Sequence, residues 1–219
     1  MKIQKRKDWE KLQRQNRIID IAENLFSSRG YDDTTMDRVA AEAGYCKRTL
    51  YIYFKDKDDL FASIVLRGLR TLNTMLHEAY ESNELGLEKI RAIARTYFRF
   101  FCEDPVSFNF MIAFDYKNRY YHRPMDPEKD GIFKVECQKI GDDNADLTIR
   151  AIEAAIEDGT IKTKLSPLQL LLILWGQLSG VMEMIATREQ FLGEIYNTNA
   201  EKLFNNFMEL TEKSLIEAK

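Results

Sequence analysis

The chain has 219 residues, 45% of them hydrophobic and 31% charged, which is ordinary for a globular protein with a substantial core. Its net charge of −3 divides into +4 over residues 1–57 (13 Lys and Arg against 9 Asp and Glu) and −7 over the remainder (19 against 26), so the basic charge is concentrated near the N-terminus. Three scattered cysteines and two histidines argue against a disulfide framework and a zinc site. The basic N-terminal segment lacks the apolar core of a signal peptide. We therefore expect a cytoplasmic protein.

The first elements are predicted to be a basic extension followed by a helix. Residues 1–13 are basic and polar, and two interpretations stay open: a frayed, solvated extension, or an arm or helix extension that contacts phosphate. Residues 14–29 carry apolar residues at helical spacing and end in Arg29-Gly30, a cation and a glycine that favour a helix C-terminus. This helix is expected to pack beneath the segment that follows it.

Residues 35–54 have the pattern of a helix-turn-helix. Thr34 or Thr35 can cap a helix, because a hydroxyl there accepts one of the unpaired N–H groups of the first turn. Gly44 ends that helix, because glycine adopts a left-handed conformation without steric cost. A second short helix is predicted over residues 47–54, and two short helices joined by a tight turn that contains glycine form this motif.

The outward face of the second short helix carries cationic, hydroxyl and aromatic groups. These groups suit a groove lined by phosphates and base edges. The alternative is a solvated basic face on an ordinary helical hairpin. The residues on this face and just beyond it are Lys47, Arg48, Thr49, Tyr51, Tyr53, Lys55 and Lys57.

The rest of the chain predicts further helices and no strands. A helix over about residues 57–81 follows directly, since no Gly/Ser-rich or Pro-rich linker intervenes. The other helices are expected at about 87–102, from Pro105 through Phe114, and at about 132–158, 166–187 and 197–218, with a loop over 117–131. We therefore predict an all-α fold of about nine helices, divided into a helix-turn-helix domain at 1–57 and a helical domain at 58–219.

The longest apolar stretch, residues 168–185, predicts a buried helix rather than a membrane span, because Gln169, Gln177 and Glu183 interrupt it. Residues 170–175 are apolar on all sides, so this helix is expected to be buried on several sides. Three small residues on one face allow another helix to approach closely, and they are Gly176, Ser179 and Gly180.

Several of these residues together resemble the signature of the TetR family of bacterial transcriptional regulators. The resemblance covers about residues 14–61 and rests on Gly30-Tyr31, Thr34-Thr35, Val39-Ala40, Ala43-Gly44-Tyr45, Thr49-Leu50-Tyr51, Tyr53-Phe54 and Lys57-Asp58-Asp59-Leu60. It implies an N-terminal DNA-binding domain and a C-terminal domain for ligand binding and dimerisation. Cys46 and Arg48 differ from the residues common at their positions in the family, so the operator sequence is not predicted.

The resemblance favours double-stranded DNA as the partner of the basic face. Thr35 is expected to donate to a phosphate, Lys47, Arg48 and Thr49 to face base edges, and Arg48 in particular to pair with guanine. Tyr51, Tyr53 and Lys57 are expected to hold the DNA backbone. The full set of expected DNA-binding residues is Thr35, Cys46, Lys47, Arg48, Thr49, Tyr51, Tyr53 and Lys57.

The resemblance also implies a homodimer and a ligand cavity. A helix-turn-helix reads few base pairs alone, so a two-fold dimer on a palindromic operator doubles the contacts. The expected interface residues are Leu172, Trp175, Gly176, Ser179, Gly180, Phe204 and Phe207. The residues expected to bind a small hydrophobic or aromatic ligand are Tyr97, Phe98, Phe101, Phe108, Met111, Phe114, Asp115 and Gln177.

The function predicted from these observations is that of a repressor which leaves its operator when a ligand binds. Two alternatives stay open: a DNA-binding regulator with no small-molecule ligand, and a helical carrier or enzyme. Enzyme activity is not expected, because the sequence shows no nucleophile–base pair, metal cluster or Gly-rich phosphate loop. No catalytic residue, metal, cofactor or membrane partner is predicted.

Overall fold

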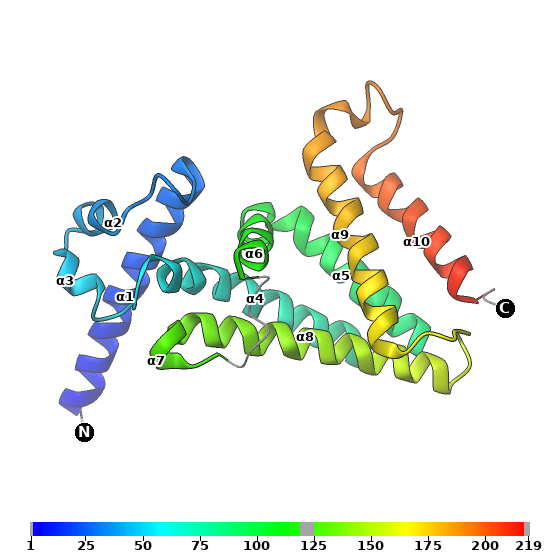
Figure 1. Ribbon diagram of the computed structural model, residues 1–219, viewed down its shortest axis with the longest axis horizontal. Helices are drawn as coiled ribbons and strands as arrows, with labels where there is room; N and C mark the ends of the chain where they lie inside the picture. The colour runs from blue at the N-terminus through cyan, green and yellow to red at the C-terminus, as the bar shows by residue number, and fades with distance from the viewer. Residues whose placement is uncertain (1, 119–124, 217–219) are drawn as a thin grey trace. The chain divides into compact units, whose positions relative to one another are not determined.

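The computed structural model describes residues 2–118 and 125–216, and this part of the chain forms ten α-helices without a β-strand (Figure 1). The helices are α1 (Lys2–Arg29), α2 (Met36–Ala43), α3 (Lys47–Leu50), α4 (Lys57–Glu81), α5 (Gly86–Glu103), α6 (Pro105–Asn118), α7 (Pro127–Asp130), α8 (Ile132–Glu157), α9 (Pro167–Leu192) and α10 (Ala200–Ile216). The prediction of an all-α fold is confirmed.

The helices gather into two compact units. The first contains Met1–Arg70 and Val106–Gly141, and the second contains Thr71–Pro105 and Asp142–Lys219. Helices α4 and α8 contribute residues to both units. The division into a DNA-binding domain and a ligand-binding domain at residue 57 is a functional one and stays a prediction.

The first unit has an apolar core that carries the two short helices. Ile18, Phe26, Val39, Leu50 and Phe61 come from α1, α2, α3 and α4, and each is at most 2% exposed. The ring of Phe26 lies edge-on to that of Phe61, with centroids 5.3 Å apart. Helices as short as α2 and α3 are unstable alone, and burying each large apolar side chain contributes about 1.5–3 kcal/mol, so this core holds them in place.

The second unit is built from α5, α9, α10 and the adjoining parts of α4 and α8. Helix α9 lies beside α10 and also contacts α5 (Figure 1). Phe98 of α5 stacks on Phe204 of α10, with ring centroids 4.0 Å apart, and Tyr97 lies edge-on to Trp175 of α9 at 5.1 Å. These ring pairs tie α5 to both C-terminal helices.

Two helices of the first unit differ from the prediction. Helix α1 begins at Lys2 rather than near residue 14, so the interpretation of residues 1–13 as a frayed extension is wrong for the described part. Lys, Arg, Gln, Glu and Leu in this segment are good helix formers, and it contains neither Gly nor Pro. Helix α3 ends at Leu50 rather than Phe54, because the N–H groups of Tyr53 and Phe54 both donate to the Leu50 carbonyl and close a turn.

Two later segments differ as well. The expected loop over residues 117–131 contains the short helix α7, which begins where Asp126 accepts hydrogen bonds from the N–H groups of Glu128 and Lys129. Residues 119–124 of that loop and the predicted end of the last helix at residue 218 lie outside the described residues. Helix α9 continues to Leu192, beyond the predicted end at Thr187.

Within one chain, helix α9 is buried along one side, so its burial on several sides stays a prediction. Its buried residues are Leu170, Leu178, Met182, Ile185 and Leu192. Other large apolar side chains are exposed: Leu168, Leu172, Ile173 and Met184 are between 45% and 62% exposed. By length and composition α9 is also the candidate for a membrane-spanning helix among the described residues. The expectation that it does not span a membrane therefore stays a prediction, supported by its packing against α5 and α10.

Candidate nucleic-acid interface

Helix α2 is fixed at both ends by local interactions. Thr35 lies in an extended conformation at its N-cap, and its Oγ1 accepts a hydrogen bond from the N–H of Arg38 at 3.2 Å. Gly44 at the other end has φ 75°, which a residue with a side chain rarely adopts, and its N–H caps the helix. The predicted cap and stop are both confirmed. Between them, Met36, Val39, Ala40 and Ala43 are buried.

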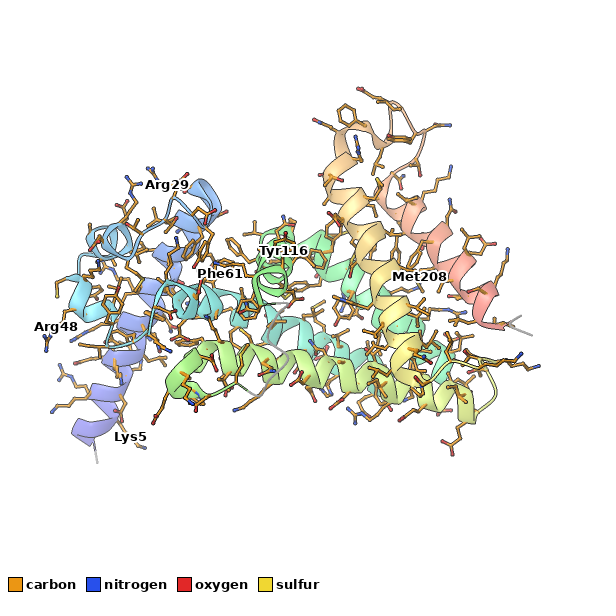
Figure 2. All side chains as sticks on the ribbon, viewed as in Figure 1. Lys5, Arg29, Arg48, Phe61, Tyr116 and Met208 are labelled. Carbon is orange, nitrogen blue, oxygen red and sulfur yellow. The ribbon has the colours of Figure 1, made fainter. Side chains whose placement is uncertain are left out.

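Helix α3 follows after a tight turn and presents its polar side to solvent. Leu50 is fully buried and Phe54 is 1% exposed, so the two residues anchor the helix and the turn behind it. Lys47 and Arg48 are exposed, and Tyr51 is 49% exposed. Figure 2 shows the Arg48 side chain pointing away from the ribbon of the first unit. No described residue pairs with its guanidinium group, which is therefore available to a ligand.

Lys47, one of the expected base-reading residues, is already engaged within the chain. Its Nζ lies 2.8 Å from Oδ2 of Asp37 on α2, and both side chains are exposed. The hydrogen bond to Asp37 raises the pKa of Lys47. An exposed pair of this kind contributes little to stability, but it determines where the ammonium group lies.

Thr49 and Cys46 also interact with each other. The Cys46 Sγ and the Thr49 Oγ1 are 3.3 Å apart, and the hydrogen bonds from Thr49 lower the pKa of the exposed Cys46 thiol. Thr49 is half-buried, so its hydroxyl is less accessible to DNA than the side chains of Lys47 and Arg48. No metal cluster of His, Cys, Asp or Glu includes Cys46 within the described part of the chain.

The aromatic and basic residues beyond α3 differ in their accessibility. Tyr51 is exposed, whereas Tyr53 is half-buried, with its ring 6.2 Å from that of Phe54. Lys57 is also half-buried; its Nζ donates to the carbonyl of Asp32 at 3.3 Å and lies 4.1 Å from the centre of the Tyr31 ring. Burial lowers the pKa of Lys57. Tyr51 is therefore better placed for a phosphate than Tyr53 or Lys57.

A polar cluster beneath the helix-turn-helix was not found from the sequence. The Tyr31 hydroxyl donates to Asp58 at the start of α4, and Lys117 of α6 and Lys134 of α8 lie 3.1 and 3.4 Å from the same carboxylate. Lys117 also lies over the Tyr31 ring. Burial opposes ionisation of Asp58, but these donors outweigh it and lower the pKa of the carboxyl group. The residues are far apart in sequence, so no local pattern connects them.

The eight expected ligand-binding residues are divided between the two units. Tyr97, Phe98, Phe101 and Gln177 belong to the second unit, and Phe108, Met111, Phe114 and Asp115 belong to the first. The six aromatic and Met residues are buried or half-buried, whereas Asp115 and Gln177 are exposed. A small cavity in the first unit is lined by Asp58, Phe61, Phe114, Lys117, Asn118 and Lys134. The ligand-binding assignment stays a prediction.

The expected interface residues also differ in their accessibility. Leu172 is 62% exposed, Gly176 and Gly180 are exposed, and Trp175, Ser179 and Phe207 are half-buried. Apart from the adjacent residues and the backbone of α9 itself, no heavy atom lies within 4 Å of where a Cβ at Gly176 or Gly180 would stand. Phe204 is 1% exposed because it stacks on Phe98, so the structure places this side chain in the core of its own unit.

Comparison with known proteins assigns the N-terminal region. The family described as "Bacterial regulatory proteins, tetR family" matches residues 18–64, which include α2, α3 and the start of α4. An HTH-type transcriptional regulator of Staphylococcus aureus is 34% identical over 84 residues, 35% of this chain and 45% of that protein. The HTH-type transcriptional activator FasR of Mycolicibacterium smegmatis is 26% identical over 104 residues, 48% of each chain. The chain therefore spans about half the length of the curated relatives it matches.

Solved structures share the fold over nearly the whole chain. A bacterial regulatory protein of the tetR family from Rhodococcus RHA1 has a TM-score of 0.63 at 16% identity, covering 92% of this chain and 96% of that one. AibR, solved with isovaleryl coenzyme A and operator DNA, has a TM-score of 0.64 at 17% identity, covering 90% and 97%. FadR of Bacillus subtilis, solved with stearoyl-CoA, has a TM-score of 0.66 at 18% identity, covering 91% and 98%. Residues 18–64 therefore match the tetR family of bacterial regulatory proteins, and the all-helical fold is shared with a solved member of that family.

Proposed function

We propose that this protein is a transcriptional regulator that binds a specific DNA sequence through α2 and α3. The observation that carries the proposal is the exposed guanidinium of Arg48, which pairs with no described residue. It lies on a short helix whose opposite side is anchored by the fully buried Leu50. A fixed helix with a free arginine suits the major groove, where Arg pairs with O6 and N7 of guanine. The match of residues 18–64 to the tetR family supports the same assignment.

The other residues of the interface take complementary roles. The Oγ1 of Thr35 accepts from the Arg38 N–H, which leaves its hydroxyl proton to donate to a phosphate near the N-terminus of α2. Tyr51 is exposed on the same short segment and contacts the sugar-phosphate backbone. Lys47 reaches a base or a phosphate after it releases Asp37. The remaining edge of the interface is formed by Thr49, Cys46, Tyr53 and Lys57.

The protein acts as a homodimer on a palindromic operator. Exposed apolar side chains along α9 support this proposal, since monomeric proteins rarely expose large contiguous apolar surfaces. Gly176 and Gly180 leave open space on the helix surface, so a partner helix can approach closely there. A dimer places two recognition helices on half-sites about 34–36 Å apart or a multiple of that distance, and this doubles the contacts with DNA.

A small hydrophobic ligand controls DNA binding in this proposal, and its binding releases the operator. Two structural neighbours were solved with acyl-coenzyme A compounds, so isovaleryl-CoA and stearoyl-CoA are the first compounds to test. Repression is proposed as the direction of control. The relative FasR is an activator, so a reporter gene placed behind the selected operator should decide between repression and activation.

The experiment that tests the proposal is selection of bound sequences from a random DNA duplex pool, followed by affinity measurements at two salt concentrations. We expect a palindromic sequence and an affinity that falls steeply as the salt concentration rises. The Arg48→Ala variant should lose preference at one base position in each half-site, with a cost of about 1–3 kcal/mol for the preferred base. The matched control is Arg29→Ala, which removes an exposed arginine at the end of α1. No enrichment of any sequence, with or without the acyl-CoA compounds, would overturn the proposal.

A further inference from the structure

The N-terminal half of α1 extends beyond the apolar core of the first unit. The helix begins at Lys2, but the first buried side chain among those described is Ile18. Residues 5–17 hold six Lys and Arg against two acidic residues. An isolated helix of this length is marginal in water. No described side chain before Ile18 is buried, so apolar packing does not account for this part of the helix, and its main feature is its positive charge.

One face of α1 changes from apolar to cationic at the edge of the core. Ile18, Ala22 and Leu25 are spaced by four and three residues, which places them on one face, and all three are buried. The same spacing continued toward the N-terminus passes through Arg14, Lys11 and Lys7, which are all exposed. We call these three residues the cationic stripe.

The cationic stripe is free of ion pairs with described residues. The acidic residue Glu10 pairs with Arg6 at 2.9 Å, on a different face of the helix. No ion pair among the described residues involves Lys7, Lys11 or Arg14. At 1.5 Å per residue, the stripe extends about 10 Å along the helix, and one strand of a duplex presents a phosphate about every 3.4 Å of its axis. Three cations over this length therefore match a short run of phosphates.

The stripe and the recognition helix belong to the same compact unit. The stripe continues the face of α1 that carries the buried Ile18, Ala22 and Leu25. Helix α1 contacts α2, the helix that precedes the recognition helix. In Figure 2, Arg48 projects at the left edge of this unit.

We propose that the cationic stripe is a second contact with DNA, in which Lys7, Lys11 and Arg14 bind backbone phosphates that flank the bases read by α3. The proposal rests on the proposed DNA-binding function and adds a site outside the segment that matches the family, residues 18–64. The stripe contributes affinity without sequence preference, because it contacts phosphates rather than base edges.

The test compares two triple variants of the full-length chain. The stripe variant is Lys7→Gln, Lys11→Gln and Arg14→Gln. The matched control is Lys5→Gln, Arg6→Gln and Arg17→Gln, which removes the same charge from other faces of the same helix. We expect the stripe variant to bind the selected operator at least about tenfold more weakly than the native protein does. The slope of log affinity against log salt concentration should fall by about 0.9 for each lost phosphate contact, so the three lost contacts should lower the slope by close to three per chain. The control should change the slope by about one or less.

A second measurement uses the length of the DNA. Removing base pairs that flank the selected site should weaken binding of the native protein and leave the stripe variant unaffected, while changing the sequence of those pairs should affect neither. Equal losses for both triple variants, or a stripe variant that still responds to shortened flanks, would overturn the inference. If the native protein selects no DNA sequence, the proposed function itself fails. If the native protein selects a sequence but the stripe variant binds it as tightly as the native protein does, only the inference about the stripe fails.

Discussion

The ammonium group of Lys47 lies 2.8 Å from Oδ2 of Asp37, so the first residue of α3 is held against the helix that precedes it. The pair connects the two helices of the motif across the turn. It also places a carboxylate at the surface that is proposed to face DNA, where a negative charge opposes the phosphates. We therefore expect the pair to limit the affinity of the protein for DNA.

The Asp37→Asn variant should bind DNA more tightly than the native protein. The change removes a negative charge near the phosphates and releases Lys47, so we expect a several-fold gain in affinity and a steeper salt dependence. Stability should change by less than about 1 kcal/mol, because both partners are exposed. Glu42→Gln, which removes an exposed carboxylate elsewhere on α2, is the control and should give a smaller gain. Equal gains would show that only the net charge of the motif matters.

Thr35 should matter for both folding and DNA binding. Thr35→Ala removes the acceptor that caps α2, so the free energy of unfolding should fall by about 1 kcal/mol, as measured by chemical denaturation. It also removes the hydroxyl proposed to donate to a phosphate, so DNA affinity should fall at all sequences alike. Thr35→Ser keeps the hydroxyl and should restore both properties. A serine variant as weak as the alanine variant in DNA binding would contradict the proposed phosphate contact.

The ends of the elements were predicted best where a local signal fixes them. Thr35 and Gly44 bound α2 as expected, and Ser166 and Gln169 form a reciprocal cap at the start of α9 beside Pro167. These interactions involve residues within a few positions of one another, so the sequence displays them directly. Helix α1 was underestimated because residues 2–13 lack apolar periodicity, although their intrinsic helix propensity is high.

The contacts of the site were less predictable than its elements. The residue types of the basic face were visible in the sequence, but the pairing of Lys47 with Asp37 depends on the geometry of the turn between α2 and α3. The interaction of Lys57 with Tyr31 and Asp32 depends on the approach of α1 to α4. Such contacts join residues that only the folded chain brings together, so they required the structure.

The polar cluster around Asp58 should make stability depend on pH in the acid range. The pKa of Asp58 is lowered in the folded chain, so its carboxylate stabilises the fold above the ordinary Asp pKa of about 3.9. This stabilisation is lost as the pH falls through the lowered value. Asp58→Asn should therefore cost about 1–2 kcal/mol at pH 7, a modest figure because the side chain is 43% exposed, and the difference from the native protein should shrink near pH 3.

The control for this measurement is Asp33→Asn, which removes an exposed carboxylate from the loop before α2. Unfolding by urea should be followed for both variants and the native protein at each pH. A cost for Asp58→Asn that stays constant from pH 7 to pH 3 would show that the hydrogen bond to Tyr31, rather than the charge of Asp58, accounts for the effect.

The exposed apolar face of α9 should be needed for dimer formation. Leu172→Glu places a charge where the proposed interface buries an apolar side chain, so the protein should sediment as a monomer and lose affinity for the palindrome. Ile132→Glu, at an exposed apolar position of the first unit, should leave the dimer intact. A dimer that survives the Leu172 change with unaltered affinity would place the interface elsewhere.

The close approach of α5 to α8 in the second unit depends on a single glycine. A Cβ at Gly86 would lie 2.0 Å from the backbone nitrogen of Ala155, and the N–H of Gly86 donates to Asp158 at 2.7 Å. Gly86→Ala must therefore separate two backbones, and we expect a loss of at least about 1–3 kcal/mol in the free energy of unfolding.

Gly141→Ala is the matched control, since nothing lies within 4 Å of a Cβ there and the residue is inside α8. That variant should be more stable than the native protein by about 0.5–1 kcal/mol, because alanine favours the helix over glycine. Thermal unfolding of both variants should therefore move the midpoint in opposite directions. A Gly86→Ala protein as stable as the native one would show that α5 can move away from α8 at little cost.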